Sequence, residues 1–183
     1  MAIENERKYI LSLTPDDIDM LVDDYGGKEQ YIQQAYIGDA RIRSKIEGDL
    51  VKFFFTWKKR RKDSSQIEIE TEITERDFME LWDFATTFVY KVRIKVYGYG
   101  VVWDVDFLFS DTGYNDHYLT VAEVEMPENM NEPKFLPDFV KNNLVYEVPR
   151  KEEAKWSNQQ LADKEKVQKM VKKVSKVSDD EAT

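Results

Sequence analysis

The chain has 183 residues and a formal net charge of −9, with 42% hydrophobic and 34% charged residues. This length and apolar share suit one domain with one core, and so acidic a chain is a poor general binder of nucleic acid. It has no cysteine, and His117 is its single histidine, which excludes disulfides, thiol nucleophiles, zinc thiolates and multi-histidine metal sites. No stretch approaches about 20 apolar residues. The N-terminus also lacks a signal-peptide pattern. We therefore expect a cytoplasmic protein with no membrane partner.

Period-two alternation of apolar and polar residues dominates the chain and predicts eight strands, joined mostly by hairpins. In chain order the strands are expected at residues 3–10, 30–37, 40–46, 50–59, 66–73, 90–97, 101–109 and 118–126. Apolar residues at helical spacing predict helices at 14–25, 75–88 and 134–144. Beyond residue 150 the chain is rich in Lys, Glu and Gln, which predicts an amphipathic helix with an acidic end. We therefore divide the chain into a main domain, 1–150, and a C-terminal tail, 151–183.

The charged residues of the predicted strands are sorted by sign. Residues two apart share one face of a strand, and three strands have a basic face while three have an acidic one. The basic faces carry Arg41, Arg43 and Lys45; Lys52 and Lys58; and Lys91, Arg93 and Lys95. The acidic faces carry Glu68, Glu70 and Glu72; Asp104 and Asp106; and Glu123 and Glu125. The first strand combines Glu4 and Glu6 with Lys8.

This sorting favours an enclosed, ligand-binding face. One such strand is ordinary in a sheet with one solvated face. Sorting sustained over many strands is unfavourable because like charges repel across a sheet, unless a polyanion and divalent cations neutralise both sets. Closing the sheet into a barrel gives all the charges one interior, and the helices can then cover the apolar outer wall. We therefore expect an α+β fold with a closed eight-stranded antiparallel β tunnel, a charged lumen and helices packed on the outside.

Seven short motifs follow the order found in the CYTH superfamily, the triphosphate tunnel metalloenzymes. Glu4-Asn5-Glu6-Arg7-Lys8 resembles the ExExK signature of that family. The others are Arg41-Ile42-Arg43, Phe55-Thr56-Trp57-Lys58, Glu68-Ile69-Glu70, Lys91-Val92-Arg93, Asp104-Val105-Asp106 and Glu123-Val124-Glu125. The resemblance covers about residues 1–126 and is closest to small bacterial inorganic triphosphatases. Lys155-Trp156-Ser157-Asn158 matches the family's (R/K)YxN pattern only loosely, so the resemblance assigns the tail no role.

The resemblance implies metal-dependent hydrolysis of a triphosphate, with inorganic tripolyphosphate giving pyrophosphate and phosphate. The implied triphosphate-binding residues are Lys8, Arg41, Arg43, Lys52, Lys58, Lys91, Arg93 and Lys95. The implied ligands of two Mg²⁺ or Mn²⁺ ions are Glu4, Glu6, Glu123 and Glu125, which form the catalytic set together with Lys8. One ion would bridge phosphate oxygens and the other would activate a water. Second-tier residues, which orient the basic groups or assist the water, would be Glu68, Glu70, Asp104 and Asp106.

The sequence is also compatible with several alternative functions. The same fold would suit a nucleoside or thiamine triphosphatase, or a class IV adenylate cyclase. A non-enzymatic alternative is a module that binds polyphosphate or nucleotides. The complete acidic set argues against that module, because binding an anion does not require carboxylates. We expect a monomer or homodimer that acts on a small molecule, with His117 in an exposed turn.

Overall fold

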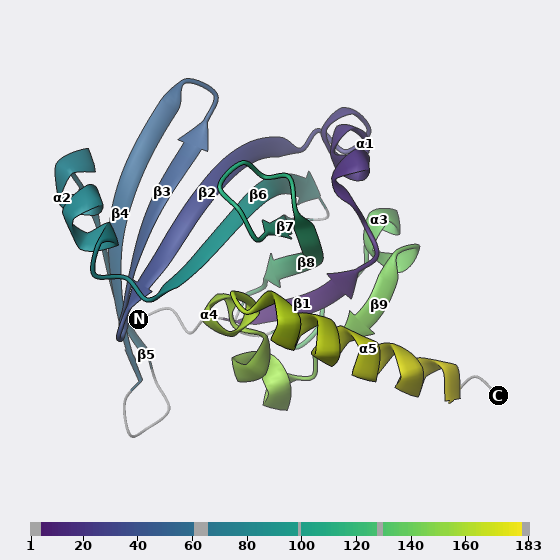
Figure 1. Ribbon diagram of the computed structural model, residues 1–183. Helices are drawn as coiled ribbons and strands as arrows, with labels where there is room; N and C mark the ends of the chain where they lie inside the picture. The colour runs from purple at the N-terminus through teal and green to yellow at the C-terminus, as the bar shows by residue number, and fades with distance from the viewer. Residues whose placement is uncertain (1–4, 61–65, 99, 128–129, 181–183) are drawn as a thin grey trace.

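Nine strands form one curved antiparallel sheet with helices packed against it (Figure 1). The computed structural model describes residues 5–60, 66–98, 100–127 and 130–180, with only the backbone described at 58–60, 66–67 and 176–180. The strands are β1 (Glu6–Leu11), β2 (Lys28–Ile37), β3 (Ala40–Glu47), β4 (Leu50–Arg60), β5 (Gln66–Ile73), β6 (Thr87–Gly98), β7 (Val101–Phe109), β8 (His117–Glu125) and β9 (Leu144–Glu147). The helices are η1 (Pro15–Asp17), α1 (Ile18–Asp23), α2 (Glu75–Trp82), α3 (Asp138–Lys141), η2 (Arg150–Trp156), α4 (Asn158–Leu161) and α5 (Lys164–Asp180). The α+β class is therefore confirmed.

The sheet is not the closed eight-stranded tunnel that we expected. Its order is β5-β4-β3-β2-β6-β7-β8-β1-β9, so β5 and β9 form its edges. Within the described part of the chain, no ladder joins these two edges, and Figure 1 places them at opposite ends of the sheet. Closure would require the edge of β1 that faces away from β8 to pair with the other end of the sheet. Strand β9 occupies that edge instead, with Tyr9 opposite Glu147 and Ile10 opposite Tyr146.

Two predicted helices are shorter than expected. Residues 75–88 form α2 only as far as Trp82, and β6 already begins at Thr87, where it pairs with β2. Residues 134–144 contain only the four-residue α3, and the chain then enters β9. In both cases the last residues of the predicted helix pair with a neighbouring strand instead, Thr87 with β2 and Leu144 with β1. The tail was also expected as one helix, but it forms η2, α4 and α5 in succession.

Helices α1, α2 and α3 cover one face of the sheet, as expected. Leu21 of α1 and Phe139 of α3 pack with Trp103 and Ile94 in one apolar cluster. Phe78 of α2 packs with strands β2, β3 and β4 in a second cluster. Burial of these side chains supplies the main driving force for folding. Among the described residues, no helix is long and apolar enough to cross a membrane.

The C-terminal tail packs against the opposite face of the sheet. Ile10, Leu108 and Val121 project from that face into a third apolar cluster, which Trp156 and Leu161 of the tail complete. This face is therefore apolar where the tail covers it, and the rest of its length carries the charged residues of the strands together with uncharged ones such as Ile32 and Phe54. The division of the chain at residue 150 stays a prediction.

Candidate polyanion-binding site

The strand register places the sign-sorted residues on one face of the sheet, which we call the charged face. Residues directly opposite each other in an antiparallel pair lie on the same face. Arg93 lies opposite Asp106, Asp104 lies opposite both Lys95 and Glu123, and Glu123 lies opposite Lys8. On β3, β4 and β5, Arg41 lies opposite Thr56, which in turn lies opposite Glu70. The charges of seven strands thus share one surface, although the sheet is open.

Arg93 stands at the centre of a buried ion-pair network on β6, β7 and β8. Its Nε and Nη2 atoms lie 2.6 Å from the two carboxylate oxygens of Asp106. Further ion pairs join Arg93 to Asp104 and to Glu123, and Lys95 Nζ lies 2.9 Å from Asp104 Oδ1. Burial opposes the charge of Arg93, but Asp106 and Asp104 outweigh it and raise the pKa of the guanidinium. This arginine is neutralised before any ligand arrives.

Lys8 neutralises two of the predicted metal ligands. Its ammonium forms ion pairs with Glu6 and Glu123. Burial opposes this charge, but Glu123 and Glu6 overcome it and raise the pKa of Lys8. Glu123 is half-buried, and burial would raise the pKa of this carboxyl, yet Lys8 keeps it below its usual range. Glu4 lies outside the described residues.

The predicted metal site is only partly assembled. Within the described ranges, no group of three or more Asp, Glu or His side chains converges as a metal site would require. Glu6 nevertheless lies opposite Glu125, and Glu123 is two residues away on the same strand. Carboxylate oxygens are the donors that Mg²⁺ and Mn²⁺ prefer. The carboxylate oxygens therefore fit a hard cation chemically. In the present structure, however, Glu6 and Glu123 are positioned around the ammonium group of Lys8.

Lys91 is the most deeply buried cation of the charged face, with 2% of its side chain exposed. Its Nζ atom donates to Asp106 Oδ2 at 2.6 Å and to Asn158 Oδ1 of α4 at 3.2 Å. Burial and the charge of Arg93 lower the pKa of Lys91 to about 8, and Asp106 offsets them only in part. Burial would raise the pKa of Asp106, but Arg93 and Lys91 hold it well below its usual range.

A second set of ion pairs occupies β3, β4 and β5, which together with α2 we call the arm. Arg41 Nη2 lies 3.3 Å from Glu70 Oε2 and 3.8 Å from Glu68 Oε1. Thr56 Oγ1 donates to Glu70 Oε2 at 2.8 Å and accepts from Arg41 Nη2 at 3.2 Å. At the far end of the arm, Lys52 pairs with Glu72 at 3.2 Å. The side chain of Lys58 lies outside the described part.

Arg43 differs from Arg41, Lys91 and Arg93 because no carboxylate that the structure describes forms an ion pair with its side chain. Among the described residues it has no hydrogen bond or ion pair to its side chain, and its Nε atom is buried without an acceptor. Its neighbours across the strands are Gln34 and Phe54 rather than carboxylates. Burial, and then the charges of Arg41 and Arg93, lower its pKa to about 10, and Glu70 offsets them only in part. A desolvated guanidinium without a directly paired carboxylate is unfavourable, and a bound anion would relieve it.

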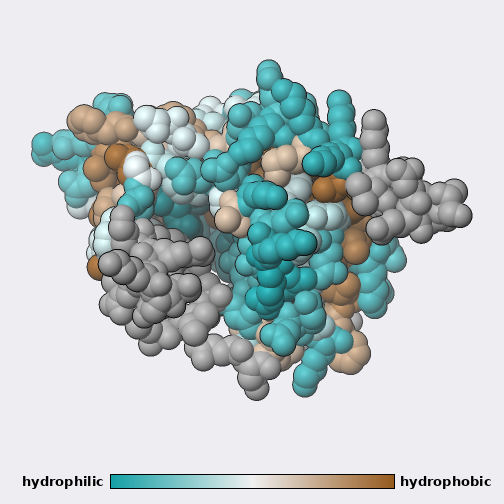
Figure 2. Space-filling model, turned by 90° about the horizontal axis from the view of Figure 1, so that it is seen from below, coloured by the Kyte–Doolittle hydropathy of each residue, from teal (hydrophilic) through white to brown (hydrophobic). Residues whose placement is uncertain are grey.

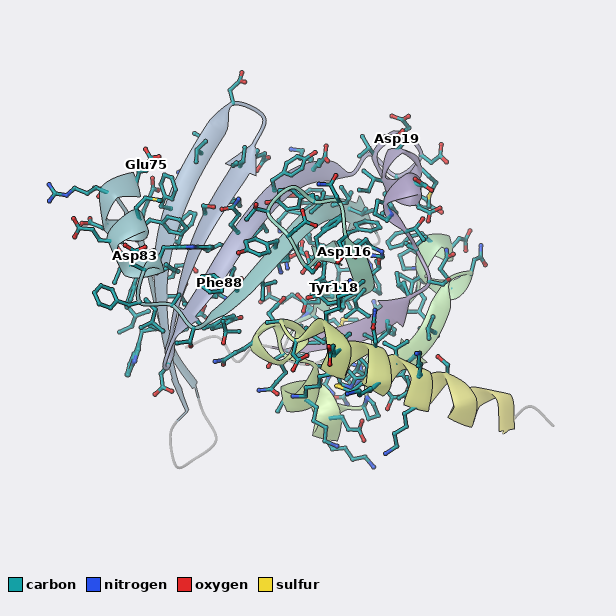
Figure 3. The ribbon with its side chains drawn as sticks, in the orientation of Figure 1. Asp19, Glu75, Asp83, Phe88, Asp116 and Tyr118 are labelled. Atoms are coloured by element: carbon teal, nitrogen blue, oxygen red, sulfur yellow. The ribbon has the colours of Figure 1, made fainter. Side chains whose placement is uncertain are left out.

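The charged face borders a hollow in the molecular surface. Figure 2, which views the molecule from below, shows the hollow between the arm and the rest of the molecule, with hydrophilic residues in its depth. Other acidic side chains, such as Asp19 of α1 and Glu75 and Asp83 around α2, project outward into solvent (Figure 3). The negative net charge is therefore carried partly by groups that lie away from the candidate site.

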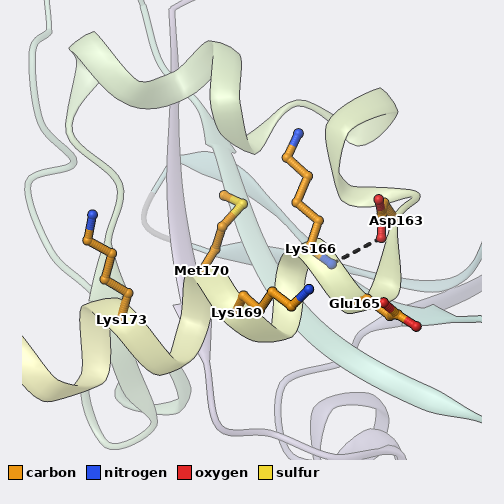
Figure 4. Close-up of a pocket in the computed structure, with 6 residues that line it drawn as sticks. All are labelled: Asp163, Glu165, Lys166, Lys169, Met170 and Lys173. Atoms are coloured by element: carbon orange, nitrogen blue, oxygen red, sulfur yellow. Dashed lines mark hydrogen bonds between the residues drawn. The ribbon is translucent and has the colours of Figure 1, made fainter.

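Two cavities lie away from the charged face and contain none of the predicted site residues. One, of about 490 Å³, lies on α5 between Lys169, Met170 and Lys173 (Figure 4). The other, of about 400 Å³, lies between β1, β8 and α5 and is lined in part by His117. His117 is half-buried at the first residue of β8, so its expected exposed position was wrong. Packing against Phe107 and Phe109 accounts for its burial.

Comparison with known proteins shows similarity to solved structures only. No family model and no curated protein matches the chain. The PH1819 protein from Pyrococcus horikoshii OT3 is 21% identical over 93% of this chain and 89% of that chain, with a TM-score of 0.46. The PH1012 protein from the same organism is 14% identical over 69% and 80%, with a TM-score of 0.44. HpAC1 from Hippeastrum, described as a putative adenylyl cyclase with a dominant triphosphatase activity, is 16% identical over 69% and 80%, with a TM-score of 0.40.

These likenesses are loose, since each TM-score lies below 0.5, and they do not assign a function to this chain. The functional proposals therefore rest on the residues of the charged face. Sequence reasoning assigned no role to one residue there, Asn158. The loose (R/K)YxN match at residues 155–158 marked this residue, but its contact with Lys91 spans 67 positions and does not follow from strand or helix spacing.

Proposed function

We propose that the charged face binds a triphosphate and, together with a divalent cation, hydrolyses its terminal phosphoanhydride bond. The observation that carries this proposal is Arg43, a largely desolvated cation beside Arg41 and Arg93 whose side chain, among the described residues, forms no ion pair. Arginine suits phosphate because its planar fork donates two parallel hydrogen bonds. Inorganic tripolyphosphate is the simplest ligand with this chemistry, and we take it as the substrate to test first.

Catalysis by this face would depend on positioning and charge rather than on a protein nucleophile. Water adds to the terminal phosphorus, the bond to the bridging oxygen breaks, and pyrophosphate leaves with the electron pair while one proton is released. Arg41, Arg43 and Arg93 would hold the phosphate oxygens on which negative charge accumulates. Lys91 would add a point charge at the buried end of the face.

The carboxylates of β1 and β8 would serve the cation. Glu6, Glu123 and Glu125 offer the oxygen ligands, and a bound Mg²⁺ or Mn²⁺ would supply charge neutralisation and a more acidic water. Lys8 would then turn from Glu6 and Glu123 towards the phosphate chain. Its present ion pairs keep these carboxylates stable until the ligand arrives.

The direct test is release of phosphate and pyrophosphate from tripolyphosphate, ATP and thiamine triphosphate, each with Mg²⁺, Mn²⁺, Ca²⁺ or a chelator. We expect metal-dependent release of phosphate from tripolyphosphate. Formation of cyclic AMP and pyrophosphate from ATP would instead indicate a cyclase. Tight binding of tripolyphosphate without release under any of these conditions would favour a binding module, and absence of binding would refute the proposal.

Glu125→Gln is the variant that best separates chemistry from folding. Glu125 is exposed and, among the described residues, no ion pair engages it. We expect this variant to keep the stability of the wild type and to lose most of its metal-dependent turnover. Glu72→Gln is the matched control, since Glu72 is also exposed and, in the part of the chain that the structure describes, its side chain pairs only with Lys52 at the end of the arm. Equal turnover in both variants would show that Glu125 holds no cation.

A further inference from the structure

The C-terminal tail places an amide group inside the charged face. Asn158 is half-buried in α4, a helix that contacts β6, and its Oδ1 atom accepts a hydrogen bond from Lys91 Nζ at 3.2 Å. Lys91 interacts electrostatically with Arg93, Glu123 and Arg43. Asn158 therefore lies beside the cations that would hold the triphosphate. None of the roles assigned so far uses it.

The chain fixes Asn158 firmly on both sides. Trp156, two residues earlier, is almost fully buried and contacts the ring of Tyr146 at 5.8 Å between centroids. Leu161, three residues later, is also buried, and its carbonyl oxygen accepts from Tyr118 Oη at 2.7 Å. A side chain between two such anchors is held in place before a ligand arrives. Pre-organisation of this kind lowers the entropic cost of binding.

The contact with Lys91 also determines which way the amide faces. An ammonium group has only donors, so the atom that meets it must be the amide oxygen. The amide nitrogen then carries two N–H groups, and among the described residues no hydrogen bond uses them. Lys91 donates one N–H to Asp106 and one to Asn158, so its third N–H can bind another acceptor. Two neighbouring side chains thus each retain a donor at the same end of the charged face.

We propose that Asn158 is a phosphate-binding residue: its carbonyl oxygen orients Lys91 while its amide N–H₂ group donates to an oxygen of the bound triphosphate. This inference rests on the proposed function of the charged face. It makes the tail part of the binding site rather than only a cover for the apolar end of that face. The ligand it recognises is a phosphate oxygen, which accepts hydrogen bonds and does not donate them when fully ionised.

The test compares Asn158→Asp with Asn158→Ala. The two variants should rank one way in affinity for tripolyphosphate and the opposite way in stability without ligand, because the amide nitrogen serves binding and the amide oxygen serves Lys91. Aspartate keeps an oxygen for Lys91 but replaces the N–H₂ donor with a negatively charged oxygen. We expect Asn158→Ala to weaken binding of tripolyphosphate about tenfold and Asn158→Asp to weaken it about a hundredfold. Without ligand we expect the reverse order, with Asn158→Asp at least as resistant to heat as Asn158→Ala. Binding is measured by calorimetry without divalent cations, and stability by thermal unfolding.

Gln159→Glu is the matched control, since Gln159 is exposed in the same helix and the substitution adds the same charge. We expect it to bind tripolyphosphate within about twofold of the wild type. A variant Asn158→Asp that binds as tightly as Asn158→Ala would overturn the inference, because a purely structural amide predicts that result. If the wild type itself binds no tripolyphosphate, both the proposed function and this role of Asn158 are refuted. If Asn158→Asp does not fold, Asn158→Leu, which has no donor, must still weaken binding at least tenfold.

Discussion

Replacing Arg43 with methionine should stabilise the protein while abolishing its affinity for tripolyphosphate. Arg43 is a desolvated cation whose strand neighbours are Gln34 and Phe54, and the repulsion of Arg41 and Arg93 adds to the cost of its burial. Methionine has a similar length and no charge. The substitution therefore removes an unfavourable charge without opening a large cavity.

The magnitude follows from the pKa of Arg43, which burial and the charges of Arg41 and Arg93 lower from its usual value to about 10. Each factor of ten in proton affinity corresponds to about 1.4 kcal/mol, so the charged form costs about 3 kcal/mol at neutral pH. Arg43 retains some exposure, and methionine forms fewer contacts than the longer side chain, so both reduce this figure. We expect Arg43→Met to raise the free energy of unfolding by about 1–2 kcal/mol.

Urea unfolding at pH 7, with and without tripolyphosphate, measures both effects at once. Ligand at a hundred times its dissociation constant stabilises the wild type by about 2.7 kcal/mol, and Arg43→Met should show little of this increase. Arg41→Met is the matched control on the same strand. Arg41 pairs with Glu70, so its loss should destabilise the protein. If both variants destabilise it equally, the charge of Arg43 does not oppose folding and our reasoning is wrong.

Three further predictions concern the buried groups. Asp106→Asn removes the buried carboxylate that pairs with Lys91 and Arg93, and should lower the free energy of unfolding by about 3–5 kcal/mol; a loss below about 1 kcal/mol would contradict the network. The pKa of Lys91 is lowered to about 8, so its charge is lost as the pH rises through that value. Affinity for tripolyphosphate should therefore fall between pH 7 and pH 9, and a Lys91→Met variant that shows the same fall would exclude Lys91 as the cause. Burial lowers the pKa of His117, so the unfolded chain takes up this proton first as the pH falls below about 6.5. The wild type should thus lose more stability than His117→Phe between pH 7.5 and pH 5, as urea unfolding at each pH will show, and identical losses would rule out this role.

Much of the charged face could be predicted because the strand period fixes which residues share a face. Two tight turns also fix the register of β2, β3 and β4. Gly38 and Gly48 both adopt a positive φ, which a glycine accommodates without strain. Counting back from the first turn places Arg43 opposite Gln34, as the structure shows. The lack of a carboxylate beside Arg43 could therefore have been read from the hairpin.

The closure of the sheet could not be predicted in the same way. A strand as short as β9 carries little pattern, and its pairing with β1 joins residues more than 130 positions apart. Leu108 and Val121 were another missed signal. They lie on the same strand faces as Asp106 and Glu123, so these faces change from charged to apolar within two residues. That change marks where the tail packs.

Because the tail covers only the end of the charged face beside Lys91, the effective dielectric constant is lower at that end than on the arm. At the end that Trp156 and Leu161 cover, the surroundings are apolar, and electrostatic interactions between nearby charges are therefore stronger than in water. On the arm, Lys52 and Glu72 are hydrated, and dissolved ions shield them within about 10 Å at 0.1 M ionic strength. An anion approaching in saline is therefore drawn most strongly to the covered end. Added salt should weaken the outer contacts first and leave the innermost ones almost unchanged.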